Sequence, residues 1–197
     1  LRSGTTQRPN FDYYWPANWD YIVVPRSTAD GTSASCPVTY TLPGNSNSTY
    51  LNYSLENNGN VTSYQVYNRL YIDDVYVWWT SWGWIDPGQH LEYNNAGPVT
   101  VKGGRHTVKV VYDPLNECTE SNESDNSWSK QYVWSPYVLT DQTPVWRSAP
   151  PERGSGTYYN CDGFQFECGT GQWWAAVGII PYNITDDYDI RLYTDYV

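Results

Sequence analysis

Methionine is absent from the sequence, and charge is sparse: Asp, Glu, Lys and Arg together make up 16% of the 197 residues. Residues that favour helices are scarce, and no stretch repeats apolar residues at helical spacing over three turns, which excludes a helical fold. Long hydrophobic runs are also missing. A stretch such as Trp173–Ile180 falls far short of the roughly 20 apolar residues that cross a bilayer as a helix. The sequence therefore predicts no membrane span.

The abundant residue types favour β-structure. There are 20 Tyr, 11 Trp, 15 Gly and 13 Pro. Tyr and Trp suit the pleated, half-buried surface of a sheet, whereas Gly and Pro mark turns. The net charge of −10 argues against nucleic acid, whose phosphates need clustered Lys and Arg, and against an anionic membrane surface. We predict an all-β protein without a nucleic-acid partner.

The four cysteines indicate an oxidising compartment. Cys161 and Cys168 bracket a short loop and are expected to form a local disulfide, which leaves Cys36 and Cys118 as the natural second pair, although four cysteines allow three connectivities. A zinc site is the alternative. It fails on spacing, because no Cys-x-x-Cys occurs and both histidines stand apart from every cysteine.

Two further features indicate export. The chain begins at Leu1 with no methionine and no signal peptide, which we interpret as a processed or partial chain. Five Asn-x-Ser/Thr sequons exceed the number expected by chance, even in an Asn-rich chain, and predict a glycosylated extracellular or cell-surface protein. The candidate glycosylation sites are Asn47, Asn52, Asn60, Asn122 and Asn183.

The chain divides into four parts by composition. Residues 1–35 form an N-terminal extended or strand segment, and residues 36–134 read as a succession of strands separated by turn signals, as in a β-sandwich. Residues 135–156 hold four prolines and predict a linker. Residues 157–197 contain the local cysteine loop and two strand candidates, too few for an independent domain. We expect a small disulfide-stapled β unit that is incomplete alone.

Alternation of apolar and polar residues assigns the two faces of the expected strands. Turn signals lie at Asn57–Gly59, Asp86–Gly88 and Gly103–Gly104. Asn52 falls between inward positions and is predicted to face solvent. The predicted inward side chains are Val38, Tyr40, Leu42, Leu51, Tyr53, Leu55, Val66, Leu70, Ile72, Val108, Val110, Trp128, Tyr132 and Trp134.

The stretch Tyr76–Trp84 is unusually rich in aromatic residues. Strict alternation would place Val75, Val77, Trp79 and Ile85 on one face of a strand. It would place Tyr76, Trp78, Trp82 and Trp84 on the other. A two-layer sandwich fills only one inner face, so the second row needs a cover. The C-terminal segment, a neighbouring subunit and a sugar stacked on the rings are the three alternatives.

An acidic cluster lies near the end of the predicted sandwich. It could hold a calcium ion through carboxylate oxygens, but its spacing does not match an EF-hand loop. The alternative is a solvated hairpin whose side chains cap turn amides. The run Asp186–Asp189 is a weaker candidate. Calcium is the only cofactor that the sequence suggests. The cluster comprises Asp113, Glu117, Glu120, Glu123 and Asp125.

Catalytic motifs are missing from the sequence. There is no nucleophile elbow, no His-Glu-x-x-His and no Gly-rich phosphate loop. Both histidines, His90 and His106, occupy strand or turn-adjacent positions. A glycosidase needs only two suitably spaced carboxylates, which sequence does not exclude. We nevertheless expect a protein that is not an enzyme.

Three stretches of residues 37–134 carry a resemblance to a known family. They are Leu51–Asn60, which ends in an Asn-x-Gly turn, Val66–Asp74, and the closing hairpin Gly104–Asn126, with Glu120, Asn122, Glu123 and Asn126 at motif positions. They resemble the CARDB family, the cell-adhesion-related domain of bacteria. The resemblance implies an immunoglobulin-like antiparallel β-sandwich in a secreted or surface protein, with no catalytic residues to transfer.

Together these observations predict a non-catalytic structural or adhesive subunit of an extracellular assembly or filament. Segments Asp12–Val24 and Tyr188–Val197 could each pair with an open sheet edge of another subunit. A carbohydrate-binding module that stacks sugars on Trp78, Trp82 and Trp84 is the first alternative. A spacer domain of a larger secreted enzyme is the second.

Overall fold

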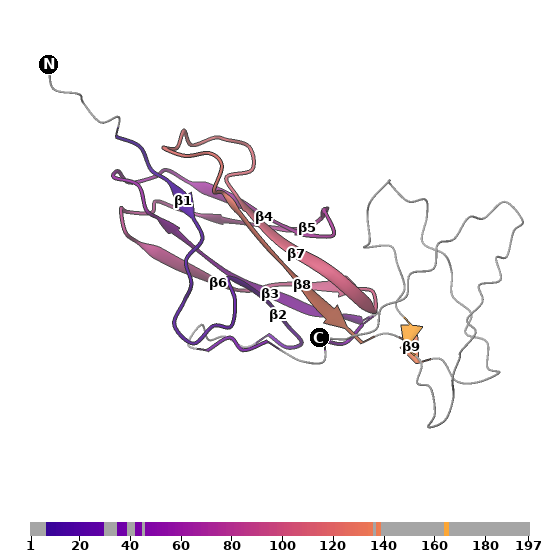
Figure 1. Cartoon of the computed structure of the whole chain (residues 1–197). Helices are drawn as coiled ribbons and strands as arrows, with labels where there is room; N and C mark the ends of the chain where they lie inside the picture. Colours follow the sequence, from indigo (N-terminus) through magenta and orange to yellow (C-terminus); the bar gives the residue numbers. More distant parts are fainter. Residues whose placement is uncertain are drawn as a thin grey trace, which may run out of the picture.

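The structure is a computed structural model that describes residues 7–29, 35–38, 42–44, 46–135, 137–138 and 164–165. These parts of the chain form β-strands joined by turns and loops (Figure 1). No helix within them is long and apolar enough to cross a membrane. The strands are β1 (Phe11–Asp12), β2 (Val23–Arg26), β3 (Ser46–Asn57), β4 (Val66–Ile72), β5 (Val75–Trp82), β6 (His90–Val101), β7 (Gly104–Tyr112), β8 (Ser127–Trp134), β9 (Tyr137–Val138) and β10 (Phe164–Gln165).

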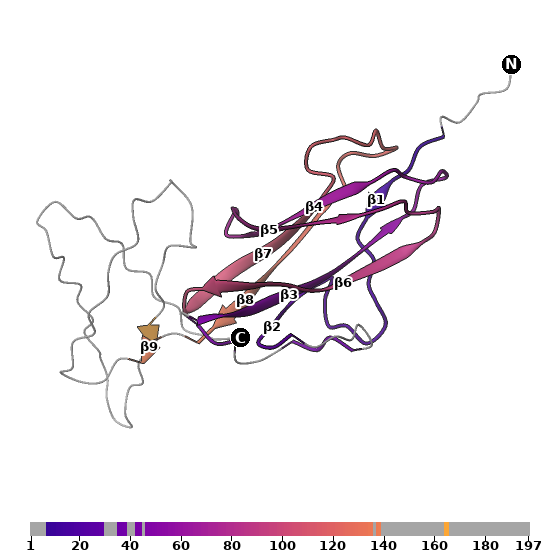
Figure 2. The same cartoon turned by 180° about the vertical axis from the view of Figure 1, so that it is seen from behind.

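Two antiparallel sheets form the body of the fold. In the first sheet β3 is central and pairs with β6 on one side and with β1 and β2 on the other. The second sheet has the order β5-β4-β7-β8. In Figures 1 and 2, β4, β5 and β7 of the second sheet are drawn above β2, β3 and β6 of the first. A short parallel pair, β9 with β10, stands apart from both sheets. The predicted all-β, antiparallel class is confirmed for the sandwich.

The core fills the space between the two sheets, and period-two alternation is the reason. Every second side chain of β4 and of β7 is buried, as the hydrophobic pattern predicts. The core also takes side chains from β3, β6 and β8. The residues predicted to face inward and found fully or nearly fully buried are Leu42, Leu51, Tyr53, Leu55, Val66, Leu70, Ile72, Val108, Val110, Tyr132 and Trp134.

Polar ends of three core aromatic side chains cross from the second sheet to the first. The Trp134 indole Nε1–H donates to Thr49 Oγ1 at 2.9 Å. The Tyr112 hydroxyl donates to the Ser54 carbonyl oxygen at 2.5 Å, and the Tyr132 hydroxyl donates to a carbonyl of β2. Buried Tyr and Trp need such partners, because an unpaired hydroxyl or N–H in the core costs free energy. These bonds fix how the two sheets lie against each other.

The N-terminal segment belongs to the same sandwich. Phe11 and Val23 are fully buried in the main core, and the strands that carry them pair with β3. The side chain of Asn10 bonds Asn58 and Asp125, and accepts hydrogen bonds from Ser121 Oγ–H and a neighbouring backbone N–H. The segment predicted to reach an open edge in another subunit is thus used within its own chain.

Gly97 occupies a place where a side chain does not fit. Its φ is +144°, and a Cβ atom there would lie 2.7 Å from the Thr49 carbonyl oxygen in the paired strand. We expect Gly97→Ala to lower the free energy of unfolding by about 2 kcal/mol or more, from the unfavourable φ and the contact with backbone. Chemical denaturation measures this loss.

Gly83 provides the matched control, because a Cβ atom there would meet nothing within 4 Å. We expect Gly83→Ala to change the unfolding free energy by less than about 0.5 kcal/mol. Equal effects of the two substitutions would contradict the argument.

Candidate functional site

A β-bulge in β5 decides which aromatic side chains reach the surface. Leu70 pairs with Trp78, but the next residue of β4, Tyr71, pairs with Tyr76, so Val77 is the extra residue. A bulge shifts the alternation of faces by one position. Tyr76 and Trp79, which strict alternation would place on opposite faces of β5, therefore lie on the same outer face.

The bulge overturns the predicted row of Tyr76, Trp78, Trp82 and Trp84. Trp78 and Trp82 pair with the core residues Leu70 and Val66, face inward and pack against the main core. Tyr76 stays outside with an exposed fraction of 50%, and Trp79, predicted on the opposite face, joins it at 56%. Trp84 is exposed but lies beyond the end of β5. The predicted outward row is therefore wrong for Trp78 and Trp82.

The neighbouring strand β4 supplies the other half of this outer face. Tyr67, Arg69 and Tyr71 alternate with buried residues and are each partly exposed. The Tyr67 and Trp79 ring centroids are 6.1 Å apart at an angle of 45°, and the Arg69 guanidinium carbon lies 5.9 Å from the centroid of the Tyr76 ring. This last contact is within the distance of a cation–π interaction.

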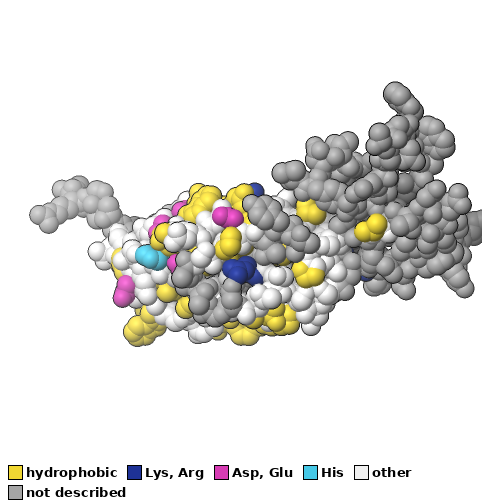
Figure 3. Space-filling view, turned by 90° about the horizontal axis from the view of Figure 1, so that it is seen from below, with side chains coloured by type: hydrophobic (Ala, Val, Ile, Leu, Met, Phe, Trp, Pro, Cys, Tyr) yellow, Lys and Arg dark blue, Asp and Glu magenta, His cyan; other side chains and the backbone are white. Residues whose placement is uncertain are grey.

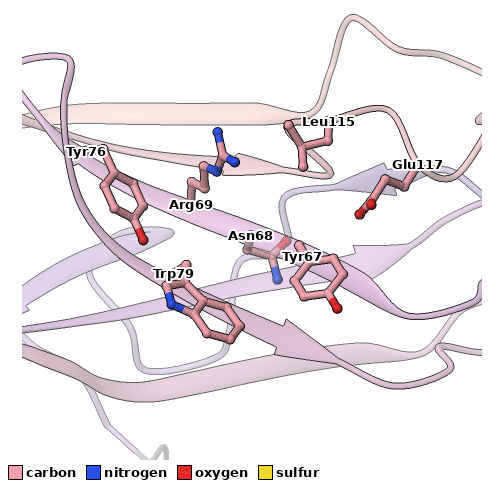
Figure 4. Close-up of a pocket in the computed structure, with 7 residues that line it drawn as sticks. All are labelled: Tyr67, Asn68, Arg69, Tyr76, Trp79, Leu115 and Glu117. Carbon is pink, nitrogen blue, oxygen red and sulfur yellow. The ribbon is translucent and has the colours of Figure 1, made fainter.

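A groove of about 610 Å³ follows this face. Figure 4 shows that its aromatic walls come from β4 and β5, while the loop between β7 and β8 brings two side chains to the opposite end. Its volume is in the range of small-ligand sites, which combine apolar walls with few polar groups. The lining residues are Tyr67, Asn68, Arg69, Tyr76, Trp79, Leu115 and Glu117.

Two charged side chains of opposite sign line the groove. Arg69 comes from β4 and Glu117 from the β7–β8 loop (Figure 4). The ion pairs found among the described residues join His106 to Asp73 and Lys109 to Asp74, and neither involves the groove. The groove thus presents a guanidinium, a carboxylate and two exposed aromatic rings.

The opposite side of the molecule looks different. Figure 3 views it from below, the side of the first sheet, where yellow hydrophobic side chains form separate small patches among white polar surface. Tyr13 and Trp15 are exposed in the segment between β1 and β2. The indole N–H of Trp15 donates to the Trp19 carbonyl oxygen at 2.8 Å, and its ring lies 6.1 Å from that of Tyr21. Trp15 therefore has a role in fixing its own loop.

The predicted calcium ligands do not converge. Asp113 accepts hydrogen bonds from the backbone N–H groups of Glu117 and Cys118 at 3.0 and 2.8 Å. Glu123 accepts the Glu120 N–H at 2.8 Å. Asp125 accepts side-chain amides at 3.1 and 2.8 Å. Where the chain is described, no group of three or more His, Cys, Asp or Glu residues could hold a metal. The possible calcium site is not supported there, because Asp113 and Glu123 accept N–H groups of their own loop and Asp125 accepts the side-chain amides of Asn10 and Asn122.

Glu120 is the buried member of this cluster, with 2% of its surface exposed. One carboxyl oxygen accepts the Phe11 backbone N–H and the other accepts the Asn126 side-chain amide. Burial raises its pKa to about 8, against the opposing effect of these two hydrogen bonds, and the negative charges of Glu123 and Asp113 raise the pKa further. Glu120 ties β1 to the β7–β8 loop rather than binding a ligand.

The two histidines have different surroundings. His90 is exposed, and its ring stacks on that of Tyr14 with centroids 4.0 Å apart. His106 is buried: Nδ1 lies 2.6 Å from a carboxylate oxygen of Asp73 and Nε2 lies 3.1 Å from the Lys102 carbonyl oxygen. The fold therefore fixes the His106 ring at both of its nitrogens.

The predicted disulfide between Cys36 and Cys118 does not form. Cys36 is buried in a small cluster with Trp19 and Val24, separate from the main core. Cys118 lies in the β7–β8 loop and packs against the main core, where burial raises the pKa of its thiol. The two thiols thus belong to different hydrophobic clusters. The pairing of Cys36 with Cys118, which was predicted because the other two cysteines form a local loop, is therefore wrong. Cys161 and Cys168 lie outside the described residues.

The sequons also separate by burial. Asn47, Asn60 and Asn122 are exposed, as a glycosylation site requires. Asn52 is fully buried, where its side-chain oxygen accepts the Asn95 N–H at 2.8 Å and its amide approaches Cys36 Sγ at 3.4 Å. The prediction that Asn52 faces solvent is wrong, because the segment around Cys36 covers the outer face of β3. A glycan on Asn52 does not fit this fold.

Several predictions lie outside the described residues. They concern the sequon at Asn183, the acidic run Asp186–Asp189, the strand candidate Tyr188–Val197, and most of the expected linker and C-terminal unit.

The sequence analysis assigned none of the five groove residues outside β5 to this surface, although a signal existed for some of them. The alternation of Tyr67 and Arg69 with buried neighbours in β4 was available to place them outward. Leu115 and Glu117 lie in a loop, where no periodicity assigns a face.

The groove and fold can be compared with known proteins. Two solved domains resemble this chain. One, from a Methanosarcina acetivorans protein named as a cell surface protein, is 21% identical, with a TM-score of 0.40, and the match covers 43% of this chain and 75% of that one. The other is the CARDB domain of a Pyrococcus furiosus protein, crystallised in complex with di-metal ions; it is 14% identical, with a TM-score of 0.44, and the match covers 66% and 97%.

No curated protein matches the chain. The sequence profile of the CARDB family matches residues 29–130, which is more than half of the 197 residues. The expected resemblance over residues 37–134 is thereby confirmed, with the match beginning somewhat earlier in the chain. The chain belongs to the CARDB family.

Proposed function

We propose that the protein is a non-catalytic, extracellular structural or adhesive module that serves in a cell-surface assembly. The outer face of β4 and β5, with its groove, is the surface that makes the adhesive contact. The observation that carries this proposal is the exposure of Tyr76 and Trp79 beside the groove, at 50% and 56%. Exposed aromatic rings of this size are typical of binding hot spots.

Family membership and burial support the same role. CARDB denotes a domain related to cell adhesion, and one structural neighbour is named as a cell surface protein. The buried polar groups His106, Glu120 and Asp113 form hydrogen bonds within the fold and so hold its sheets and loops together. The exposed aromatic rings of the groove take no part in this internal bonding, so they are available to contact a partner.

An attachment assay tests the proposal. Beads coated with the full chain are expected to attach to cell envelopes of the producing organism. The double variant Tyr76→Ser, Trp79→Ser should attach about tenfold less, because it removes both exposed rings of the groove. Trp84→Ser is the matched control: it removes an equally large exposed ring that does not line the groove, and attachment should persist.

Attachment that is unchanged in the double variant would overturn the assignment of this face. No attachment of the unaltered chain, together with a monomeric state in sedimentation velocity at all concentrations, would overturn the adhesive and assembly role itself.

A further inference from the structure

We propose that the groove formed by β4, β5 and the β7–β8 loop binds a neutral polysaccharide, with a sugar ring stacked on Trp79 and hydroxyl groups held between Arg69 and Glu117. This inference rests on the proposed function, because it names the chemical class of partner for the same face. It differs in its residues from the sugar platform predicted from the sequence, because none of Trp78, Trp82 and Trp84 lines the groove.

The aromatic walls give the first reason. Trp79 is 56% exposed, and its angle of 45° to the Tyr67 ring leaves the two rings tilted rather than closed on each other. An aromatic face carries partial negative charge. The C–H bonds on one face of a pyranose ring carry partial positive charge, so a sugar lies flat on such a ring. The Tyr76 ring lies nearby in Figure 4, but Arg69 lies over it, so Trp79 is the ring on which the sugar stacks.

The charged side chains give the second reason, and they select among ligands. A guanidinium only donates hydrogen bonds and an ionised carboxylate only accepts them. An anionic ligand would pair with Arg69 but be repelled by Glu117, and a cationic ligand would meet the reverse. A sugar hydroxyl both donates and accepts, so a neutral sugar satisfies both side chains at once. Their opposite charges in one groove therefore point to an uncharged, hydroxyl-rich ligand.

The Arg69 guanidinium is already oriented for this task. It lies over the Tyr76 ring, 5.9 Å from the ring centroid, and neither it nor Glu117 takes part in the ion pairs found among the described residues. A planar group held in place by stacking loses less conformational freedom when it bonds a ligand. The fold thus presents its donors in advance of binding.

Affinity electrophoresis of the full chain tests the inference. Native gels contain either a neutral polysaccharide, namely hydroxyethylcellulose, xylan, mannan or dextran, or an acidic one, namely polygalacturonate or alginate. We expect at least one neutral gel to retard the chain, and Trp79→Ala to weaken that binding about tenfold or more. Trp79→Phe should keep most of the binding, because it keeps a ring to stack on. Trp84→Ala should bind as the unaltered chain does.

The two polar variants separate the ligand classes. For a neutral sugar, Arg69→Gln and Glu117→Gln should each weaken binding by several fold, since each removes one side of the hydrogen-bonding pair. Retardation by acidic polysaccharides alone, lost in Arg69→Gln and strengthened in Glu117→Gln, would overturn the proposal in favour of an anion site.

Failure of this inference is distinguishable from failure of the proposed function. If no neutral gel retards the chain but its beads still attach to envelopes through Tyr76 and Trp79, the ligand class is wrong and the adhesive face stands. If sedimentation velocity shows that the groove variants abolish self-association instead, the occupant is a second copy of the chain. If the unaltered chain neither binds a neutral polysaccharide nor attaches to envelopes, both proposals are overturned.

Discussion

Replacing Asp73 with alanine is expected to lower the free energy of unfolding by about 4 kcal/mol. Asp73 lies in the turn between β4 and β5, and its carboxylate is nearly inaccessible to water. One oxygen accepts the Thr107 N–H at 2.7 Å and the other lies 2.6 Å from His106 Nδ1. Alanine would leave the buried His106 ring nitrogen and the partly buried Thr107 N–H without this partner, and removing one partner of a buried pair is among the most damaging single changes.

The His106 ring explains why this pair matters. Its second nitrogen, Nε2, faces the Lys102 carbonyl oxygen at 3.1 Å. Both ring nitrogens therefore face oxygen atoms, so the ring is fixed at both nitrogens. The pair joins the β4–β5 turn to β7 beneath the edge of the Trp134 ring, whose centroid is 5.7 Å from that of His106.

Asp74 is the matched control for this experiment. It also pairs with a cation of β7, Lys109, but its side chain is 79% exposed. Exposed ion pairs contribute about 0–1 kcal/mol. Both aspartates have positive φ, +49° and +64°, so alanine incurs the same backbone strain at either position.

Urea unfolding followed by tryptophan fluorescence measures both variants. Their difference reports the buried pair alone, because the strain is common to both. A difference below about 1 kcal/mol would contradict the role assigned to Asp73 and His106.

The regular strands were predictable from the sequence because burial on one face enforces a period of two. In β4 and β7 every second residue is buried, and the alternation named these residues correctly. The centre of the core was also predictable, because exposing large apolar side chains such as Tyr53 and Trp134 to water would cost free energy. The fold class follows from composition and pattern together.

The aromatic residues of the groove were less predictable because one unpaired residue in β5 decides which side chains face outward. Val77 interrupts the pairing of β4 with β5, and sequence alternation has no means of locating the interruption. Trp78 and Trp79 exchange roles as a result. Asn52 shows a second limit: its strand position faces outward as predicted, but a segment distant in sequence covers it and makes it buried.

Stability is also expected to depend on pH through one residue. The pKa of Glu120 is raised by burial to about 8, well above the ordinary value of 4.5 that it has in the unfolded chain. Between these two values the folded protein retains a proton that the unfolded chain has lost. The stabilisation from this group is therefore complete below about pH 4.5 and is lost as the pH rises through 8.

The size of this effect follows from linkage. One pKa unit corresponds to about 1.4 kcal/mol of unfolding free energy. The difference between the folded and unfolded pKa values of Glu120 therefore limits how far this group can lower the unfolding free energy between pH 5 and pH 9. We expect the unaltered chain to lose about 3 kcal/mol of its unfolding free energy through Glu120 over that range. Unfolding in urea at pH 5, 7 and 9 measures the decline.

Glu120→Gln isolates this contribution from other groups that titrate in the same range. Glutamine resembles the protonated carboxyl in shape and carries no charge. Its side-chain oxygen can accept the Phe11 N–H in place of the carboxyl oxygen. Its NH2 group can donate to the Asn126 side-chain oxygen once the Asn126 amide turns over, and that oxygen has no hydrogen-bond partner among the described residues. We therefore expect the variant to fold, to match the unaltered chain at pH 5, and to be the more stable of the two at pH 9. Parallel declines in the two proteins would show that the Glu120 carboxyl does not control this pH dependence. The buried carboxyl that holds β1 against the β7–β8 loop would then be ionised at neutral pH, and the raised pKa would be wrong.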